Sequence, residues 1–435
     1  MLYFLATFDN ARLRYVLDVV FGRILGVEYQ LLNIGEYQAS QPSPTINYTS
    51  MMLPEAFSIP NAGLLQQEGV EAVDTRMQEG GLPYLFYYAT SGKSYKLPYD
   101  LFSAVFYLLT DYEKYVEAHY DRYDRYEPTA YPSRDWQLAD RPLVHLYCEQ
   151  LWGLLIEAFG EAALPKRKAR KFETQFTFDI DFPWKYRYKG FKVAAGGMLK
   201  DLVRGEWGRF AERLKTHISR RDPNDTFALI YQHFSPEQTR FFFLIDRTSE
   251  HDSRFTYEHP QYGALIREIV AKGYEIGVHP SFESYLDYNV LSHEHWALSQ
   301  LTGQEIRRSR QHFLRYRLPE TYRHLLKLGI REEYSSCLFQ TGGFPNGMAL
   351  PYPWFDLLAN QETELMIQPT HIMDRTLQQY LDLHPEAAAD RYTAIRDATR
   401  EVGGQFRVLL HNDVLSESEE WQGWRDLVLR WASES

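Results

Sequence analysis

Two aspartates follow a predicted strand near the middle of the chain. The strand is expected over Phe172–Phe178, and Asp179 and Asp181 come directly after it, separated by one residue. Two carboxylates at a strand end can divide the work of a hydrolytic site, because one can accept a proton while the other binds a metal ion. An aspartate in this position is also a common helix cap or turn residue, so the pair by itself does not establish a function.

Imidazole and guanidinium groups follow three further predicted strands. His279 ends an apolar stretch, Arg310 and His312 come at the end of the next strand, and His411 follows the last strand. Imidazole is a common zinc ligand, and arginine can hold a carboxylate through two hydrogen bonds. Each residue also has a purely structural interpretation, as a buried hydrogen-bonded histidine or a surface arginine. Their joint position at strand ends is improbable by chance and favours a common site.

The elements that must position these residues alternate between strands and helices. The predicted strands are Phe172–Phe178, Arg240–Leu244, Tyr274–His279, Arg307–Gln311, Glu332–Ser336, Leu365–Gln368 and Phe406–Leu410. Helical segments between most of them are typical of a parallel sheet or barrel. In barrels of this kind, catalytic residues collect at the carboxyl ends of the strands, and we therefore expect the side chains named above to meet.

The same residues resemble the motifs of the polysaccharide deacetylase (NodB-homology) family of carbohydrate esterases, which remove acetyl groups from sugars. The four motifs of that family resemble Thr177–Asp181, Glu275–Ser281, Arg310–Phe313 and Leu409–His411. The resemblance implies an α/β fold, a distorted (β/α)7 barrel preceded by a smaller α+β domain. It also implies a deacetylase that acts on an acetylated saccharide, with N-acetyl groups preferred.

A role for each residue follows from the same resemblance. The expected ligands of a divalent metal ion, with zinc expected, are Asp181, His279 and His312. Asp179 would be the general base, and Arg310 would hold it as a carboxylate. His411 would be the general acid that protonates the departing nitrogen.

The sequence departs from the family pattern at two positions. The family places two aspartates side by side, whereas Ile180 separates them here, and the position of the second family histidine is Glu283. Either Glu283 supplies an oxygen ligand or His312 supplies the missing nitrogen. We favour His312 because it lies at a strand end. A site that binds metal weakly or not at all is a third outcome.

Two other functions stay open at this level. A catalytically degenerate barrel could bind a glycan or a protein, and a complete site could hydrolyse an amide that is not part of a sugar. Metal content separates the first of these from a deacetylase, and a panel of substrates separates the second.

The part of the chain before the motifs mixes helical and extended segments. Helices are expected over Asn10–Gly26, Leu101–His119 and Leu143–Phe159, and the basic, proline-containing stretch Leu164–Lys171 breaks the pattern. We place a domain boundary there, between an accessory domain of residues 1–168 and a barrel of residues 169–435. The first domain resembles the accessory region of a subgroup of uncharacterised deacetylase-like proteins.

Composition excludes several classes of protein. The 435 residues carry a formal charge of −11, which argues against a nucleic-acid partner, and no apolar run is long enough to span a membrane. Two cysteines, Cys148 and Cys337, form no disulfide framework. A cytoplasmic location is expected, and the oligomeric state is not indicated.

Aromatic residues make up 15% of the chain, and most of them are expected in the core. Three are predicted to lie in loops that line a sugar groove, where a flat ring could stack on a saccharide: Trp184, Tyr352 and Trp354.

Overall fold

The computed structural model describes residues 1–75, 82–88, 95–127 and 138–434, and the chain divides into two compact units. The first consists of Met1–Phe172, Gly343–Pro369 and Ile395–Gln405, and the second contains the remaining segments. The predicted boundary at residue 168 lies close to the end of the first long segment. The predicted boundaries placed the two later segments of the first unit in the second domain instead.

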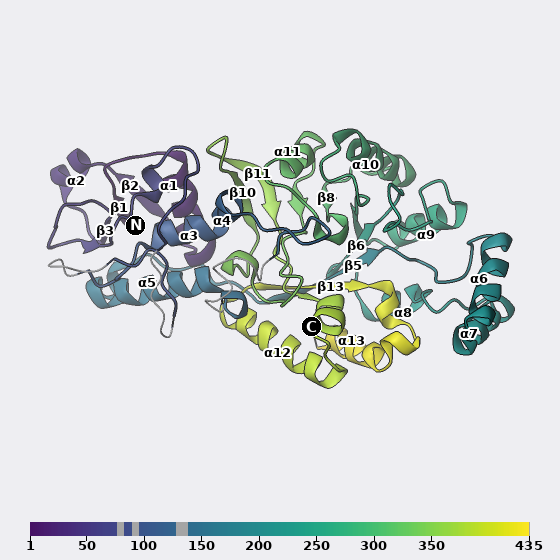
Figure 1. Ribbon diagram of the computed structural model, residues 1–435. Coiled ribbons are helices and arrows are strands. Elements are labelled where there is room, and N and C mark those ends of the chain that lie inside the picture. Colours follow the sequence, from purple (N-terminus) through teal and green to yellow (C-terminus); the bar gives the residue numbers. More distant parts are fainter. Residues whose placement is uncertain (76–81, 89–94, 128–137, 435) are drawn as a thin grey trace. The chain divides into compact units, whose positions relative to one another are not determined.

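The first unit is built on a small sheet with strand order β2-β1-β3-β4, in which the strands pair in parallel. These strands are β1 (Leu2–Leu5), β2 (Tyr29–Leu32), β3 (Thr45–Asn47) and β4 (Phe57–Ser58). The helices are α1 (Ala11–Leu17), α2 (Ile34–Ser40), α3 (Leu101–Leu109), α4 (Tyr112–Val116) and α5 (Leu143–Phe159) (Figure 1). The bounds of α5 are those expected from the sequence.

The later segments add an antiparallel hairpin to the first unit, made of β10 (Tyr352–Asp356) and β11 (Gln361–Ile367). The strand expected at Leu365–Gln368 overlaps β11, but β11 pairs with β10 in antiparallel rather than parallel fashion. Tyr352 and Trp354 lie in β10 with 1% and 2% of their surface exposed. The prediction that they line a sugar groove from a loop is therefore wrong, because both rings are packed inside the unit.

The second unit contains a parallel array in which the strand order is β9-β8-β7-β6-β5-β13-β12. Its strands are β5 (Glu173–Ile180), β6 (Thr239–Phe243), β7 (Glu275–Val278), β8 (Arg308–Ser309), β9 (Glu332–Glu333), β12 (Ile372–Met373) and β13 (Gln405–His411). Phenylalanines of β5 and β6 are fully buried and stack across the strands. Parallel strands buried on both faces need such continuous apolar runs.

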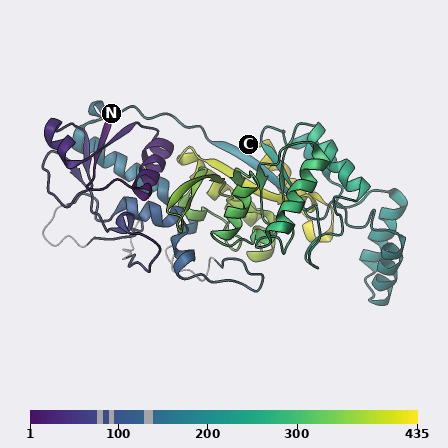
Figure 2. The same ribbon diagram turned by 90° about the horizontal axis from the view of Figure 1, so that it is seen from above.

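Helices connect these strands and cover the sheet in two groups (Figure 1). One group contains α9 (Pro260–Ala271), α10 (Tyr288–Thr302) and α11 (Glu320–Lys327). The other contains α8 (Phe227–His233), α12 (Pro385–Glu401) and α13 (Trp424–Ser433). Two more helices, α6 (Phe191–Val203) and α7 (Trp207–Ser219), come after β5 and before β6 in the sequence. They lie side by side in space (Figures 1 and 2).

The mixed α/β class and the parallel sheet expected from the sequence are confirmed. The strand order is open, and no pairing among the described strands closes it into a ring. The closed form of a (β/α)7 barrel is thus not found. Within the described part of the chain, no helix combines the length and the apolar character that a membrane crossing requires.

Candidate metal centre

Three side chains meet at the carboxyl ends of neighbouring parallel strands. Asp181 follows β5, His279 follows β7, and His312 lies three residues beyond β8. Each offers one ligand atom, and these atoms all lie within 4.8 Å of one another. One carboxylate and two imidazoles at this spacing can hold a divalent metal ion.

Both imidazole rings are held so that the same nitrogen faces Asp181. Nδ1 of His279 lies 2.5 Å from the carbonyl oxygen of Arg310, and Nδ1 of His312 lies 3.0 Å from Oδ1 of Asp252. Because each acceptor receives a hydrogen bond from the Nδ1–H group, a neutral ring presents the lone pair of Nε2. These Nε2 atoms lie 3.3 Å and 3.8 Å from the two carboxylate oxygens of Asp181.

Asp252 is a residue of the candidate site that the sequence reasoning missed. It lies in the long loop between β6 and α9, and its side chain is fully buried. Oδ2 accepts hydrogen bonds from the backbone N–H groups of Thr248 and Ser249, and Oδ1 accepts one from that of Phe282. These bonds and His312 hold the pKa of Asp252 well below its usual range, although burial opposes the shift. Metal-binding histidines often donate their other N–H group to a carboxylate, which orients the ring. The sequence could not identify Asp252 in this role, because an aspartate inside a polar loop belongs to no regular pattern of residue spacing.

The surroundings of Asp181 fit a cation. Burial alone would raise the pKa of Asp181, but protonated imidazoles at His279, His312 and His411 hold this pKa well below its usual range. A metal ion bound between neutral rings would supply the same positive charge. Oδ1 of Asp181 is buried and accepts no hydrogen bond. A buried carboxylate oxygen without a donor, facing two imidazole lone pairs, is satisfied by a positive charge between them.

Asp179 lies beside this group and is paired with Arg310. The guanidinium of Arg310 is fully buried and donates from Nη1 to Oδ1 of Asp179 at 2.7 Å and to the hydroxyl of Thr177 at 2.8 Å. It also lies over the ring of Phe242, 4.6 Å from the centroid. Gly277 makes room for that ring, since a Cβ there would stand 2.5 Å from it.

His411 approaches the group from the end of β13. Its Nδ1 lies 2.8 Å from Oδ1 of Asp374, and its Nε2 lies 3.6 Å from Oδ2 of Asp181. Burial alone would lower the pKa of His411, but Asp374 and Asp181 raise it to about 9. Asp374 directly follows the short strand β12, which the sequence reasoning missed because a two-residue strand has no periodicity to detect.

The structure thus brings together six of the residues named from the sequence. We call them the strand-end cluster: Asp179, Asp181, His279, Arg310, His312 and His411. Glu283, the alternative ligand, is exposed and is not part of the group of ligand atoms.

Trp184 is not placed as the sequence suggested. Only 5% of its surface is exposed, and its ring packs edge-on against Tyr188 and Phe255. It has no free face on which a sugar could stack in this structure, so the substrate-binding prediction for Trp184 is corrected.

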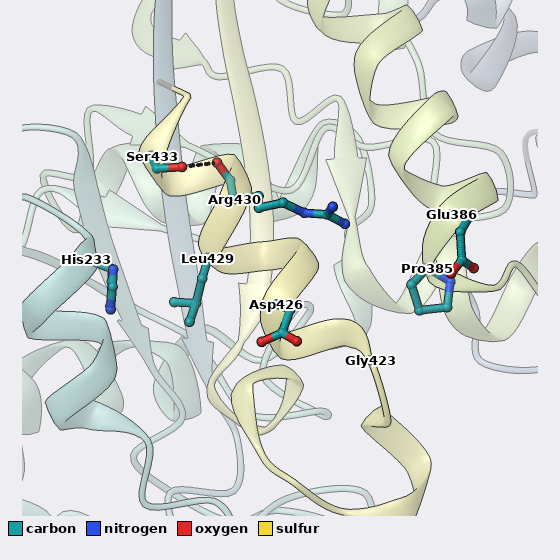
Figure 3. A pocket seen from close by; sticks show the side chains of 8 residues that line it. All are labelled: His233, Pro385, Glu386, Gly423, Asp426, Leu429, Arg430 and Ser433. Atoms are coloured by element: carbon teal, nitrogen blue, oxygen red, sulfur yellow. Dashed lines mark hydrogen bonds between the residues drawn. The ribbon is translucent and has the colours of Figure 1, made fainter.

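A separate hollow of about 650 Å³ lies between α8, α12 and α13 in the second unit (Figure 3). Its lining residues are His233, Pro385, Glu386, Gly423, Asp426, Leu429, Arg430 and Ser433. No residue of the strand-end cluster lines it, and it is therefore distinct from the metal centre.

Comparisons with known proteins assign neither an activity nor a substrate. Residues 1–160 match a family of unknown function, DUF7033, and no curated protein matches the chain. A protein of Mycobacterium smegmatis assigned as a polysaccharide deacetylase has a similar structure, with 15% identity and a TM-score of 0.39 over 62% of this chain and 86% of that chain.

Two further solved structures show lower similarity. The polysaccharide deacetylase Bc1974 of Bacillus cereus is 12% identical, with a TM-score of 0.31 over 60% of this chain and 87% of that chain. BA3943 of Bacillus anthracis, described as a CE4 family pseudoenzyme, is 9% identical, with a TM-score of 0.31 over 61% of this chain and 62% of that chain. At these levels of similarity the solved structures assign no activity to this chain.

Proposed function

We propose that this protein is a metal-dependent deacetylase that hydrolyses acetyl groups, preferably N-acetyl groups, of a saccharide. The observation that carries the proposal is the arrangement of the strand-end cluster, in which a three-residue ligand group lies between an arginine-paired aspartate and an aspartate-paired histidine. The saccharide is proposed from the resemblance of the motifs to those of sugar deacetylases.

Asp181, His279 and His312 would hold the metal ion. Two imidazoles and one carboxylate suit zinc and similar divalent ions, and three protein ligands leave positions open for substrate. When bound, the ion would supply a Lewis acid that polarises the acetyl carbonyl.

Asp179 would take the proton of the attacking water. The buried Arg310 donates to Oδ1 of Asp179 at 2.7 Å and so fixes the direction of the carboxylate. The further contacts of Arg310 with Thr177 and with the Tyr334 carbonyl fix the position of the guanidinium. Arg310 is thus a positioning residue for the base.

His411 would give a proton to the departing nitrogen. An amine leaves poorly without a proton, and the Asp374 carboxylate, 2.8 Å from Nδ1, raises the pKa of His411 and favours its protonated form. Asp374 accepts from Nδ1, which directs Nε2 toward the cluster. The acid and the base thus differ in charge and environment, as hydrolysis of an amide requires.

Metal content and acetate release, measured on the same preparations, test this function. We expect one equivalent of metal and acetate release from N-acetylated oligosaccharides. Asp179→Asn should bind metal but lose activity by about 10²–10⁴-fold, as expected for loss of a general base. Asp181→Ala should lose both metal and activity, whereas Asp390→Asn, an exposed carboxylate on α12, should change neither.

Two results would contradict the proposal. Full activity of Asp179→Asn would show that Asp179 is not the base. Wild-type protein that binds no metal after reconstitution would instead favour a degenerate site that serves binding.

A further inference from the structure

The helical hairpin of α6 and α7 (Phe191–Ser219) packs with its polar side inward. The one residue of α6 that is buried is Asp201, and the one buried residue of α7 is Thr216. Asp201 accepts from Nε of Arg213 at 2.8 Å across the two helices. Arg213 also lies against Gly197, where a Cβ would stand 2.4 Å from the guanidinium. An ion pair across the helices and the close approach at Gly197 thus contribute to the contact between α6 and α7.

Apolar side chains of the hairpin point outward instead. On α6 the exposed residues Phe191, Leu199 and Leu202 recur at intervals of eight and three, which places them on one face. Phe191 is 87% exposed.

Helix α7 carries an exposed apolar stripe of its own. Trp207, Leu214 and Ile218 recur at intervals of seven and four, and Trp207 and Ile218 are 66% and 75% exposed. Exposure of such an apolar face to water is unfavourable, and its free-energy cost grows with the exposed area.

The hairpin, together with the residues that flank it, is basic in an acidic protein. Residues 185–221 contain eleven lysine and arginine residues and three acidic residues, although the whole chain has a charge of −11. Lys192, Lys200, Arg204 and Lys215 are among the exposed ones. This local excess attracts an anionic surface and opposes the approach of a second, equally basic hairpin.

We infer that the α6–α7 hairpin docks the protein on the surface of a membrane that contains anionic lipids. A helix with an exposed apolar stripe and a basic polar side lies in the headgroup region, where it buries the stripe and pairs its cations with lipid phosphates. The outward stripes of α6 and α7 supply the apolar contact, and residues 185–221 supply the charge. The hairpin does not cross the membrane.

The base of the hairpin is tied to the edge of the sheet that carries the metal centre. Asp222 accepts backbone N–H bonds from Lys185, Tyr186 and Arg187 at 2.7–2.8 Å. Asn224 and Asn412 both donate to the carbonyl of Phe182, the residue after Asp181. Docking would therefore hold the carboxyl edge of the sheet in a defined position beside the membrane.

Sedimentation with lipid vesicles tests the inference. The full chain is mixed with vesicles of phosphatidylcholine alone or of phosphatidylcholine with phosphatidylglycerol, and the bound fraction is measured at low and high salt. We expect binding to the mixed vesicles that weakens with salt. The double variant Trp207→Ser, Ile218→Ser should bind at least about tenfold less, since two exposed anchors are lost.

Matched variants complete the design. Lys215→Glu with Arg204→Glu should also weaken binding to the mixed vesicles. Leu286→Ser with Trp296→Ser removes two exposed apolar residues elsewhere in the same unit and should leave binding unchanged. All of these side chains are exposed, so the variants should fold, which circular dichroism checks.

Three results would overturn the inference. The first is absence of wild-type binding to the mixed vesicles, and the second is equal loss in the Leu286/Trp296 control. The third is a dimer in analytical ultracentrifugation that the Trp207/Ile218 variant abolishes, which would show that a second copy covers the stripes.

Discussion

The strand-end cluster and the α6–α7 hairpin both invert the usual distribution of residues. The cluster buries charged groups such as Asp179 and Arg310, and the hairpin exposes apolar groups such as Trp207 and Ile218. Buried charges are costly unless paired, and exposed apolar stripes are costly in water. In the cluster, Oδ1 of Asp181 is a buried acceptor without a donor, whereas the hairpin leaves its apolar stripes uncovered. Departures from the inside–outside rule therefore identify both regions as candidates for binding something outside the chain.

The largest difference between the regions should appear on removal of a buried charge. Arg310→Met leaves the Asp179 carboxylate buried without its partner, so we expect the free energy of unfolding to fall by about 3–5 kcal/mol. Chemical denaturation measures this change. Arg307→Met, at an exposed surface ion pair with Glu305, should cost at most about 1 kcal/mol. If both variants lost the same unfolding free energy, the buried pair would contribute no more to stability than the surface pair, and the prediction would be wrong.

Metal affinity should depend on Asp252, whose carboxylate contacts Nδ1 of His312. Asp252→Ala removes the acceptor of Nδ1, and we expect the metal affinity to fall by about 10–100-fold because the ring loses its orientation. Isothermal titration with zinc gives the affinity, and Asp390→Ala serves as the control. An unchanged affinity would mean that packing alone orients His312.

Stability should depend on pH through Glu294, a buried residue on α10 that accepts from the backbone and hydroxyl of Ser281. Burial raises its pKa to about 8. The folded protein therefore keeps a proton that the unfolded chain releases above about pH 4.5. Glu294 should thus lower stability by up to about 1.4 kcal/mol per pH unit as the pH rises toward 8.

Replacement of this glutamate isolates its contribution. Glu294→Gln keeps the shape but removes the titration, so its unfolding free energy should depend less steeply on pH between about 4.5 and 8. Denaturant titrations of both proteins across this range measure the slopes. Parallel curves would show that Glu294 does not titrate in this way.

The smallest effect should come from the hairpin. Trp207→Ala changes a side chain that is 66% exposed, so we expect the free energy of unfolding in the absence of lipid to change by at most about 0.5 kcal/mol. Phe178→Ala, at a fully buried aromatic residue of β5, should cost about 3–5 kcal/mol in the same assay. A large loss for Trp207→Ala would show that its ring is covered in solution.

Strand ends made much of the site predictable from the sequence. Asp179, His279 and His411 lie at or directly beyond the carboxyl ends of strands with clear apolar runs, and parallel strands bring such positions to one edge. The choice between His312 and Glu283 required the fold, because both lie a few residues beyond strands and only the fold places His312 within the ligand group. Asp252 and Asp374 were missed since a long loop and a two-residue strand carry no periodic signal.

The aromatic residues show the same limit. Trp184, just after Asp181, and Tyr352 and Trp354, after Gly347, were expected in loops that line a sugar groove, but all three are buried. Exposure depends on which distant segments pack on a ring, and a local pattern does not report those segments. The exposed rings of the hairpin were overlooked for the same reason.

The sequence by itself determined the α/β class, the alternation of strands and helices, and the residue types that end the strands, since these depend on local periodicity. Only the tertiary structure decided which of those residues share a ligand group, which carboxylates orient the imidazoles, and which apolar faces stay uncovered. These properties arise from contacts between segments far apart in the chain, such as His411 with Asp181 or Arg310 with Asp179. Such contacts exist only when the folded sheet brings the strand ends together.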